Sequence, residues 1–259
     1  PKVVAKVGEK VKAGSVLMID KNRPEIKFVS PVSGEVTAVN RGEKRKVLSI
    51  VVKPDAQIEY EEFGKKNVAS LQGAEVKEVL LNAGMWPFIK QRPYDIVAAP
   101  LDTPRDIFVS AFYSAPLAPN FDFIVKGQEA DFQTGLNALA KLTNGKVYVG
   151  VRSGSVVSGV KGVEIVEVEG PHPAANVGVQ INHIKPVNKG EVVWTVNPAD
   201  VIVIGRLFNK GVADFSRMVA ITGSETTERG YVKTISGCTI KSLVNGKVLG
   251  QEPVSYTHL

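Results

Sequence analysis

The chain has 259 residues, a length that suits two domains; 44% of the residues are hydrophobic and 22% are charged. This composition is typical of a globular protein, and no apolar run reaches the ~18 to 20 residues of a membrane span. The single cysteine, Cys238, excludes an intrachain disulfide, argues against a cysteine-ligated cluster or structural zinc, and suits a reducing cytoplasm.

The net charge of +6 is concentrated near the N-terminus, where residues 1–53 carry 12 Lys and Arg against 5 Asp and Glu. A dense basic cluster comprises Arg41, Lys44, Arg45 and Lys46. It is either a solvated face or a surface that meets an acidic partner or anionic lipid. Nucleic acid is not expected, because the cluster lacks interleaved aromatic residues. The start at Pro1, with no Met and no apolar signal core, indicates a fragment without a visible secretory signal.

The first 55 residues have the alternating pattern of β-strands, interrupted by turns at Gly8, Gly14 and residues 31–34. The K-x-G-[DE]-x-V-x-x-G pattern followed by SPVSGEV resembles the lipoyl and biotinyl carrier fold. Lys21 is the candidate for the modified lysine of that fold, but it lies farther before Pro31 than the carrier pattern places it. We therefore expect the carrier fold without its swinging arm.

From residue 68 the pattern changes to alternating helices and strands. Helical spacing covers residues 76–83, with Gly84 as a C-cap, and again residues 128–145. The expected strands cover residues 95–100, 106–112, 146–151, 163–170 and 200–205, the last followed by a short helix to residue 211. This order predicts an α/β layered domain with a largely parallel sheet.

After about residue 228 the pattern indicates short strands with turns at Gly237 and at residues 245–246. We interpret this part as the incomplete start of a small β-rich domain with the irregular tail PVSYTHL. The expected domain limits are residues 1–55, 56–227 and 228–259.

No motif for independent chemistry is visible. GxGxxG and GxxxxGK[ST] are absent, and the glycine-rich segment 152–162 is interpreted as a loop, with anion binding as the alternative. The histidines lack metal-ligand spacing, and no nucleophile elbow occurs. The carboxylates are interpreted as ordinary caps and turn residues: Asp102, Asp106, Asp122, Asp131 and Asp200. We therefore predict no catalytic and no metal site in this chain.

Five blocks in sequence carry a family resemblance over roughly residues 1–250. They are SPVSGEVTAVNRGEKRKVLSIVV, AGMWPFIKQRPYDIVA, PRDIFVSAFYSAPLAPNFDFIVKGQEADFQTGLNAL, EGPHPAANVGVQINHI and DVIVIGRLFNKG. Together they resemble the A-subunit family of the bacterial sodium-translocating NADH:quinone reductases.

The resemblance implies a mixed α/β chain: an N-terminal barrel-sandwich hybrid, a Rossmann-like domain similar to the flavoprotein subunit of respiratory complex I, and the start of a β-grasp-like domain. It also implies a peripheral protein at the cytoplasmic face of the bacterial inner membrane, which it reaches only through integral partners. The complex oxidises NADH, reduces quinone such as ubiquinone and exports Na⁺, with flavins and iron–sulfur centres on other subunits and no cofactor bound by this chain. Quinone binding is ascribed to the A-subunit, and the competing view is a site shared with, or wholly on, a membrane-embedded subunit.

The flavin-binding relatives have a GxGGxGFP turn after the first helix, where this chain has NAGMWPF. We expect Met85 and Trp86 to fill the space of the phosphate. The leading hypothesis is a structural subunit; the alternatives are a quinone- or flavin-binding electron-transfer module and a lipoyl carrier fused to an α/β enzyme. Candidates for contacts with quinone or a partner are Trp86, Arg92, Tyr94 and His172.

Overall fold

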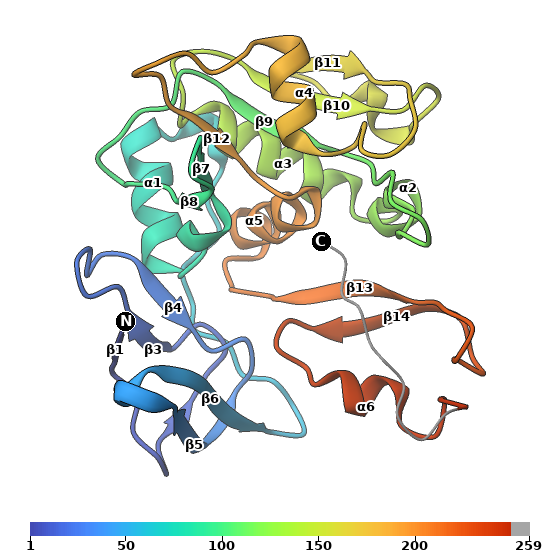
Figure 1. The fold of residues 1–259 in the computed structure, drawn as a ribbon. Helices are drawn as coiled ribbons and strands as arrows, with labels where there is room; N and C mark the ends of the chain where they lie inside the picture. Colours follow the sequence, from blue (N-terminus) through green and yellow to red (C-terminus); the bar gives the residue numbers. More distant parts are fainter. Residues whose placement is uncertain (250–259) are drawn as a thin grey trace.

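The computed structural model describes residues 1–249 (Figure 1), so the tail segment 253–259 and its His258 lie outside the described residues. The chain forms a β module, a layered α/β domain and a C-terminal hairpin with a short helix. Within residues 1–249, none of the helices combines the length and the apolar character that crossing a membrane demands.

The N-terminal module consists of two small antiparallel sheets. One has the order β1-β3-β4 and the other β2-β5-β6. The module has a small hydrophobic core of its own, formed by Ala5, Val11, Leu17 and Val36. This arrangement confirms the predicted barrel-sandwich hybrid. The strands are β1 (Lys2–Val3), β2 (Lys10–Val11), β3 (Val16–Ile19), β4 (Lys27–Val29), β5 (Gly34–Arg41) and β6 (Val47–Pro54).

A six-stranded sheet of order β11-β10-β9-β12-β7-β8 forms the centre of the α/β domain. The strands β11, β10, β9 and β12 run parallel, whereas β7 and β8 are antiparallel at one edge. The expected mixed α/β class with a largely parallel sheet is thus confirmed. Their bounds are β7 (Lys90–Arg92), β8 (Ile96–Val97), β9 (Ile107–Ser110), β10 (Val147–Val151), β11 (Glu164–Glu167) and β12 (Val193–Thr195).

Helices cover both faces of this sheet. On one face Phe108 and Val193 pack with Ile181 of α4, while Ile107 and Val109 belong to the main core on the other face. Alternating residues of β9 therefore point to opposite faces, as a strand buried on both sides requires. The helices are α1 (Gly73–Asn82), α2 (Phe121–Val125), α3 (Glu129–Ala140), α4 (Val177–Ile184) and α5 (Pro198–Lys210), with short 3₁₀ helices η1 (Glu43–Arg45), η2 (Val68–Ser70), η3 (Trp86–Phe88) and η4 (Val156–Gly159).

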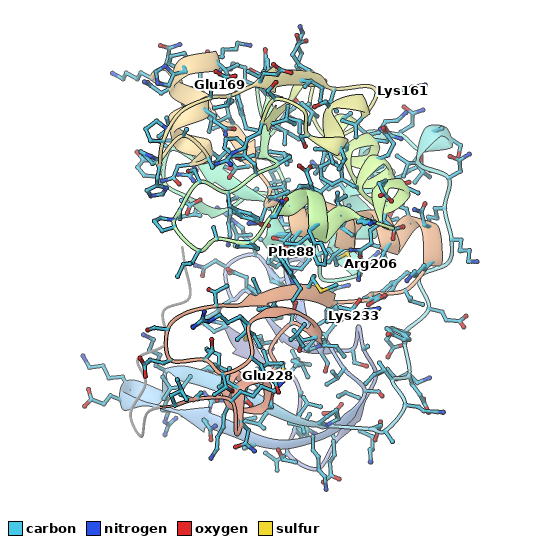
Figure 2. The ribbon with its side chains drawn as sticks, turned by 90° about the vertical axis from the view of Figure 1, so that its right-hand side faces the viewer. Phe88, Lys161, Glu169, Arg206, Glu228 and Lys233 are labelled. Carbon is cyan, nitrogen blue, oxygen red and sulfur yellow. The ribbon has the colours of Figure 1, made fainter. Side chains whose placement is uncertain are left out.

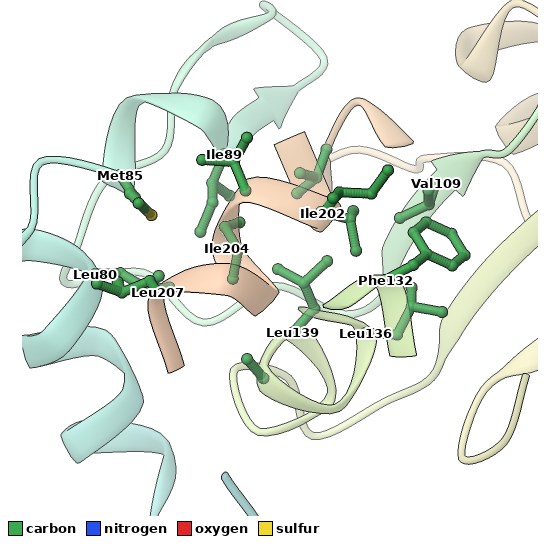
Figure 3. Packing of buried hydrophobic residues seen from close by; sticks show 14 of the residues in the cluster. Leu80, Met85, Ile89, Val109, Phe132, Leu136, Leu139, Ile202, Ile204 and Leu207 are labelled. Carbon is green, nitrogen blue, oxygen red and sulfur yellow. The ribbon is translucent and has the colours of Figure 1, made fainter. Parts of the chain in front are cut away.

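Helices α3 and α5 approach each other closely through glycines. A Cβ on Gly205 would lie 1.7 Å from the carbonyl oxygen of Asp131, and one on Gly135 would lie 2.1 Å from that of Val201. Around this contact Leu136 and Leu139 of α3 pack in one core with apolar residues of α5 (Figure 3). The absence of side chains at the crossing lets the two backbones touch.

The structure corrects the expected strand at residues 200–205. Residues 198–210 form one continuous helix, α5, because Asn197 caps its N-terminus by accepting a hydrogen bond from the Ala199 N–H and Pro198 occupies its first turn. The apolar residues of α5 are buried on every side of the helix. Their spacing in the sequence therefore lacks the polar face that marks an amphipathic helix. The predicted strand at 95–100 is also short: β8 has two residues, and Ile96 is 47% exposed.

The C-terminal part consists of the antiparallel hairpin β13 (Ser216–Ile221) and β14 (Gly230–Ile235), followed by α6 (Ile240–Val244). The helix α6 corrects the expectation of strands throughout this part. The hairpin spans residue 227, where we expected a domain limit; the limits themselves stay a prediction.

Arg206, labelled in Figure 2, joins α5 to this hairpin. Its buried guanidinium donates to the carbonyl oxygens of Asp214 and Ser216 at 3.1 and 2.9 Å, and to Gln128 Oε1 at 2.8 Å. Burial alone would raise the pKa of Asp214, but hydrogen bonds from Ser216 and Lys210 and the charge of Arg206 lower it to about 2.

Candidate functional site

The turn after α1 is filled by its own side chains. Gly84 adopts a left-handed conformation with φ of 67°, and Met85 and Trp86 are both fully buried. The indole N–H of Trp86 donates to the carbonyl oxygen of Ala98 at 2.8 Å, and its ring meets Trp194 edge-on with centroids 5.4 Å apart. A flavin phosphate held at a turn of this kind would need open backbone N–H groups, as glycine-rich turns provide. The side chains here do not fit that group.

The N-terminal module closes the same turn from the other side. A Cβ on Gly84 would lie 2.4 Å from Val29 Cγ1, so β4 packs directly against the end of α1. Ile26, which is 1% exposed, belongs to the main core of the α/β domain. Figure 3 shows Leu80 and Met85 in the same core as Leu207 of α5. The turn after α1 therefore packs both in the main core and against the N-terminal module.

The carboxyl ends of the parallel strands form a second, polar region. From β9 the chain continues to β10 on one side, whereas β12 lies on the other side of β9. The strand order therefore reverses between β9 and β12. Ligands of open α/β sheets bind outside the carboxyl ends of the strands at such a point. Here Tyr113 follows β9 and Asn197 follows β12, and the Tyr113 hydroxyl donates to Asn197 Oδ1 at 3.4 Å.

His172 lies next to this region. Its Nδ1 is 3.1 Å from Ser114 Oγ, which also accepts the Ala175 N–H at 3.0 Å. The buried Gln180 Nε2 of α4 donates to Ser110 Oγ at 2.9 Å and to the Ala174 carbonyl at 3.2 Å. These bonds hold the loop that carries His172 against the end of β9. The imidazole itself is exposed.

Burial and the nearby Asp200 carboxylate raise the pKa of Tyr113, against the hydrogen bond with Asn197 and the charge of Arg217. Its hydroxyl therefore remains a hydrogen-bond donor at neutral pH. Burial also raises the pKa of Asp200, although Arg217 Nη2 pairs with its carboxylate. The carboxyl edge can thus offer the imidazole to a hydrogen-bonding ligand, whereas the phenol hydroxyl would first have to turn away from Asn197.

Arg92 and Tyr94 lie on the β7–β8 hairpin at the antiparallel edge of the sheet. Arg92 Nε is 3.4 Å from Asp95 Oδ1, and Tyr94 is 81% exposed. Among the described residues, no hydrogen bond or ion pair joins any two of the four predicted contact residues. The structure therefore places Trp86 in the core, Arg92 and Tyr94 on a hairpin and His172 at the carboxyl edge.

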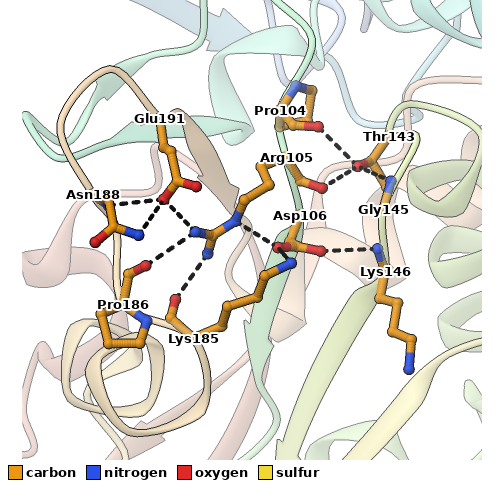
Figure 4. A network of polar contacts seen from close by, with 10 residues as sticks. All are labelled: Pro104, Arg105, Asp106, Thr143, Gly145, Lys146, Lys185, Pro186, Asn188 and Glu191. Carbon is orange, nitrogen blue, oxygen red and sulfur yellow. Dashed lines mark hydrogen bonds and ion pairs between the residues drawn. The ribbon is translucent and has the colours of Figure 1, made fainter.

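The amino ends of the parallel strands hold a polar network that the sequence interpretation missed (Figure 4). Asp106, expected to be an ordinary turn residue, is 1% exposed and accepts from Arg105 Nε and Lys185 Nζ, each at 2.8 Å. Its other oxygen accepts the Lys146 N–H at 3.1 Å. These bonds lower its pKa despite burial, and they tie the starts of β9 and β10 to the segment after α4.

An open cavity of about 770 Å³ adjoins this network. The charged groups around it are already paired within the chain: Arg105 bonds with Asp106, with Glu191 and with the carbonyl oxygens of Lys185 and Pro186. These contacts have a structural explanation: they hold the starts of β9 and β10 against the segment after α4. The only signal in the sequence was the charge of Arg105 and Asp106 at a strand entry, and their partners lie about 40 to 80 residues away in the chain.

Two other regions singled out in the sequence, the turn at Lys21 and the loop 152–162, are held by hydrogen bonds within the chain. Lys21 is exposed at the turn between β3 and β4, which Asp20 closes by accepting the N–H groups of Asn22 and Arg23. In the loop 152–162, Asp122 Oδ1 accepts from Ser155 Oγ at 2.6 Å and from the Val156 N–H at 3.2 Å, so the chain's own carboxylate occupies the start of η4.

His183 lies in the last turn of α4. Cys238 is exposed. Within residues 1–249, no three His, Cys, Asp or Glu side chains gather as metal ligands would.

Comparison with known families follows the same division of the chain. The family described as NqrA N-terminal barrel-sandwich hybrid domain matches residues 1–55, the NqrA second alpha/beta domain matches residues 71–213, and the NQRA C-terminal domain matches residues 218–254. The chain belongs to the NqrA family. The resemblance carried by the five sequence blocks is thereby confirmed.

Curated relatives of the NqrA family agree with this assignment. The A-subunit of the Na(+)-translocating NADH-quinone reductase of Neisseria meningitidis serogroup A is 36% identical over 253 residues, which cover 96% of this chain and 57% of the relative. The corresponding protein of Hahella chejuensis is 37% identical over 253 residues, covering 96% and 56%, and that of Photorhabdus laumondii is 35% identical over 252 residues, covering 96% and 56%. The chain thus spans just over half the length of these relatives.

Proposed function

We propose that this chain is the N-terminal part of a peripheral NqrA protein that supports a sodium-translocating NADH:quinone reductase without binding a flavin itself. In this role it lies at the cytoplasmic face of the bacterial inner membrane, held by integral partner subunits. NADH oxidation, quinone reduction and Na⁺ export then take place with the flavins and iron–sulfur centres of those partners.

One observation carries the proposal: the turn after α1 holds Met85 and Trp86, both fully buried, where a flavin phosphate would need open backbone N–H groups. The turn is also pinned by the Ala98 carbonyl and by Val29 of the β module. A turn rebuilt in this way supports a role in stabilising the α/β domain and its neighbours instead of transferring electrons.

Two assays test the proposal. The purified chain alone should not reduce a short-chain ubiquinone with NADH. A complex stripped of NqrA should still oxidise NADH with ferricyanide, and adding the complete NqrA protein should restore quinone reduction. NADH:quinone reduction by this chain alone would overturn the proposal.

A second candidate function is direct binding of the quinone head group. It is favoured by the hydrogen-bond donors at the carboxyl edge, where the Tyr113 hydroxyl and the exposed His172 could bond to quinone carbonyls. Calorimetric titration with a short-chain quinone should then give binding that Tyr113→Phe weakens about fivefold to tenfold, the effect of one lost hydrogen bond. Unchanged affinity in this variant would remove the second candidate.

A further inference from the structure

The tip of the β5–β6 hairpin has a backbone conformation that does not suit its residues. Lys44 and Arg45 are the two central residues of a turn closed by a hydrogen bond from the Lys46 N–H to the Glu43 carbonyl at 3.1 Å. Their φ angles are 52° and 60°. Hairpin turns with positive φ at both central positions strongly prefer Asn-Gly, because other L-residues are strained there. Lys44 and Arg45 therefore occupy two positions at which neither residue favours the stability of the turn.

The cations at this tip are not used for contacts inside the chain. Arg41, Lys44, Arg45 and Lys46 are all exposed, and within residues 1–249 none of them forms an ion pair. Arg41 Nη1 donates to the Arg45 carbonyl at 3.1 Å, which keeps the cluster together without neutralising it. The one acidic residue at the tip is Glu43. The cluster thus remains strongly positive.

An apolar side chain lies beside these cations. Leu48 is 63% exposed, and its nearest atom is 3.2 Å from where a Cβ on Gly42 would lie, so the leucine covers the base of the turn. Val51, farther along β6, is 41% exposed. The hairpin lies at the margin of the molecule, on the side away from the six-stranded sheet (Figures 1 and 2). Nothing in the described chain covers this face.

We propose that the tip of the β5–β6 hairpin binds an anionic lipid surface, with Arg41, Lys44, Arg45 and Lys46 on the lipid phosphates and Leu48 among the headgroups. Clustered cations beside an exposed apolar side chain are the combination that holds proteins at such surfaces. Four flexible cations on one turn suit a dispersed layer of phosphates better than the fixed carboxylates of one acidic protein. This contact goes beyond the proposed function, in which partner subunits hold the chain at the membrane.

The strained turn gives a sharp test. Lys44→Asn with Arg45→Gly creates the preferred Asn-Gly turn and removes two charges together. This double variant should keep its melting temperature or raise it by about 2 to 4 °C, because the new residues suit the backbone. Each cation near an anionic surface strengthens binding about fivefold, so the variant should bind about 25-fold more weakly.

The measurement is co-sedimentation of the full chain with vesicles of phosphatidylcholine containing about a third phosphatidylglycerol, with pure phosphatidylcholine vesicles as a blank. Wild-type binding should fall steeply as salt rises from 0.05 M to 0.5 M. The matched control is Lys161→Gln with Lys189→Gln, which removes the same charge from two exposed lysines of the α/β domain. This control should bind as the wild type does.

Each other outcome overturns the proposal. Equal weakening in both double variants would mean that net charge alone drives binding. Failure of the wild type to bind anionic vesicles at low salt, together with binding to polyglutamate-coated beads, would assign the cluster to an acidic protein. Failure to bind either would leave the cluster as solvated surface. None of these results bears on the proposed role in the reductase. That role is tested separately by the quinone-reduction assay of the chain alone and by the reconstitution assay.

Discussion

The turn after α1 and the carboxyl edge of the parallel strands lie in one domain but have opposite character. At the turn, Met85 and Trp86 are fully buried and pack in the main hydrophobic core. At the edge, Tyr113, Ser114 and the exposed His172 gather polar groups outside the strand ends. One domain thus buries the turn after its first helix in the core and leaves hydrogen-bonding groups accessible at the carboxyl edge of its sheet.

Helix α5 connects the two regions. Its N-cap, Asn197, accepts from Tyr113 at the carboxyl edge, while Leu207 packs in the core that includes Met85. A change that disturbs the turn should therefore cost stability, and a change at the polar edge should not.

Trp86→Ala should have the largest effect. It empties a fully buried indole site and leaves the Ala98 carbonyl without its donor, so the free energy of unfolding should fall by about 3 to 5 kcal/mol. Urea denaturation followed by circular dichroism measures this change. Tyr94→Ala, at a side chain that is 81% exposed, is the control and should stay within about 0.5 kcal/mol. Similar losses in both variants would contradict a structural role for the turn.

Gly205→Ala should disturb the contact between α3 and α5 that supports the turn. Its Cβ would lie 1.7 Å from the Asp131 carbonyl oxygen, so we expect a loss of about 1 to 3 kcal/mol in urea denaturation. Gly178→Ala in α4 is matched in chemistry but has open space around it, and it should be neutral or stabilising by up to about 1 kcal/mol. A Gly205→Ala variant as stable as wild type would mean that the helices separate easily.

Asp214 should make stability depend on pH near the end of α5. Its pKa is lowered from 3.8 to about 2 in the folded chain, so the unfolded chain binds the proton more readily. The resulting stabilisation, about 2 kcal/mol, should be complete well above pH 4 and should disappear as pH falls from about 4 to about 2. Comparing wild type with Asp214→Asn by urea denaturation over this range isolates the contribution of this carboxylate. A constant difference between the two would assign the acid sensitivity to other groups.

His172→Gln should have the smallest effect on stability. The imidazole is exposed and its Nδ1 contacts only Ser114 Oγ at 3.1 Å, so the change should stay within about 0.5 kcal/mol by thermal denaturation. A larger loss would show that the polar edge, like the turn, is part of the scaffold.

Local patterns predicted much of the fold. Gly84 stands in the left-handed conformation expected of a C-cap, and the helix at Glu129–Ala140 follows its apolar spacing. The strand expected at residues 200–205 was wrong because a run of apolar residues buried on every side has the same appearance in a helix and a strand. The signal that separates them was the Asn197-Pro198 start, which is typical of a helix N-terminus.

The site was less predictable because its contacts join distant parts of the chain. Trp86 could be placed in the turn after the first helix from its neighbours, but its bond to Ala98 and its contact with Trp194 depend on how the sheet folds. Asp106 was interpreted as a turn residue, since its partners Lys146 and Lys185 are remote in sequence. The roles of Trp86 and Asp106 depend on contacts between residues that are distant in the chain, and no local sequence pattern reveals such contacts.

Because Met85 and Trp86 fill the turn after α1, we expect this chain to bind no flavin. The most direct test is the visible absorption spectrum of the purified chain after incubation with FMN and gel filtration. We predict a colourless protein, with all flavin eluting separately. Retention of about one equivalent of FMN would contradict the account and would place electron transfer in this chain.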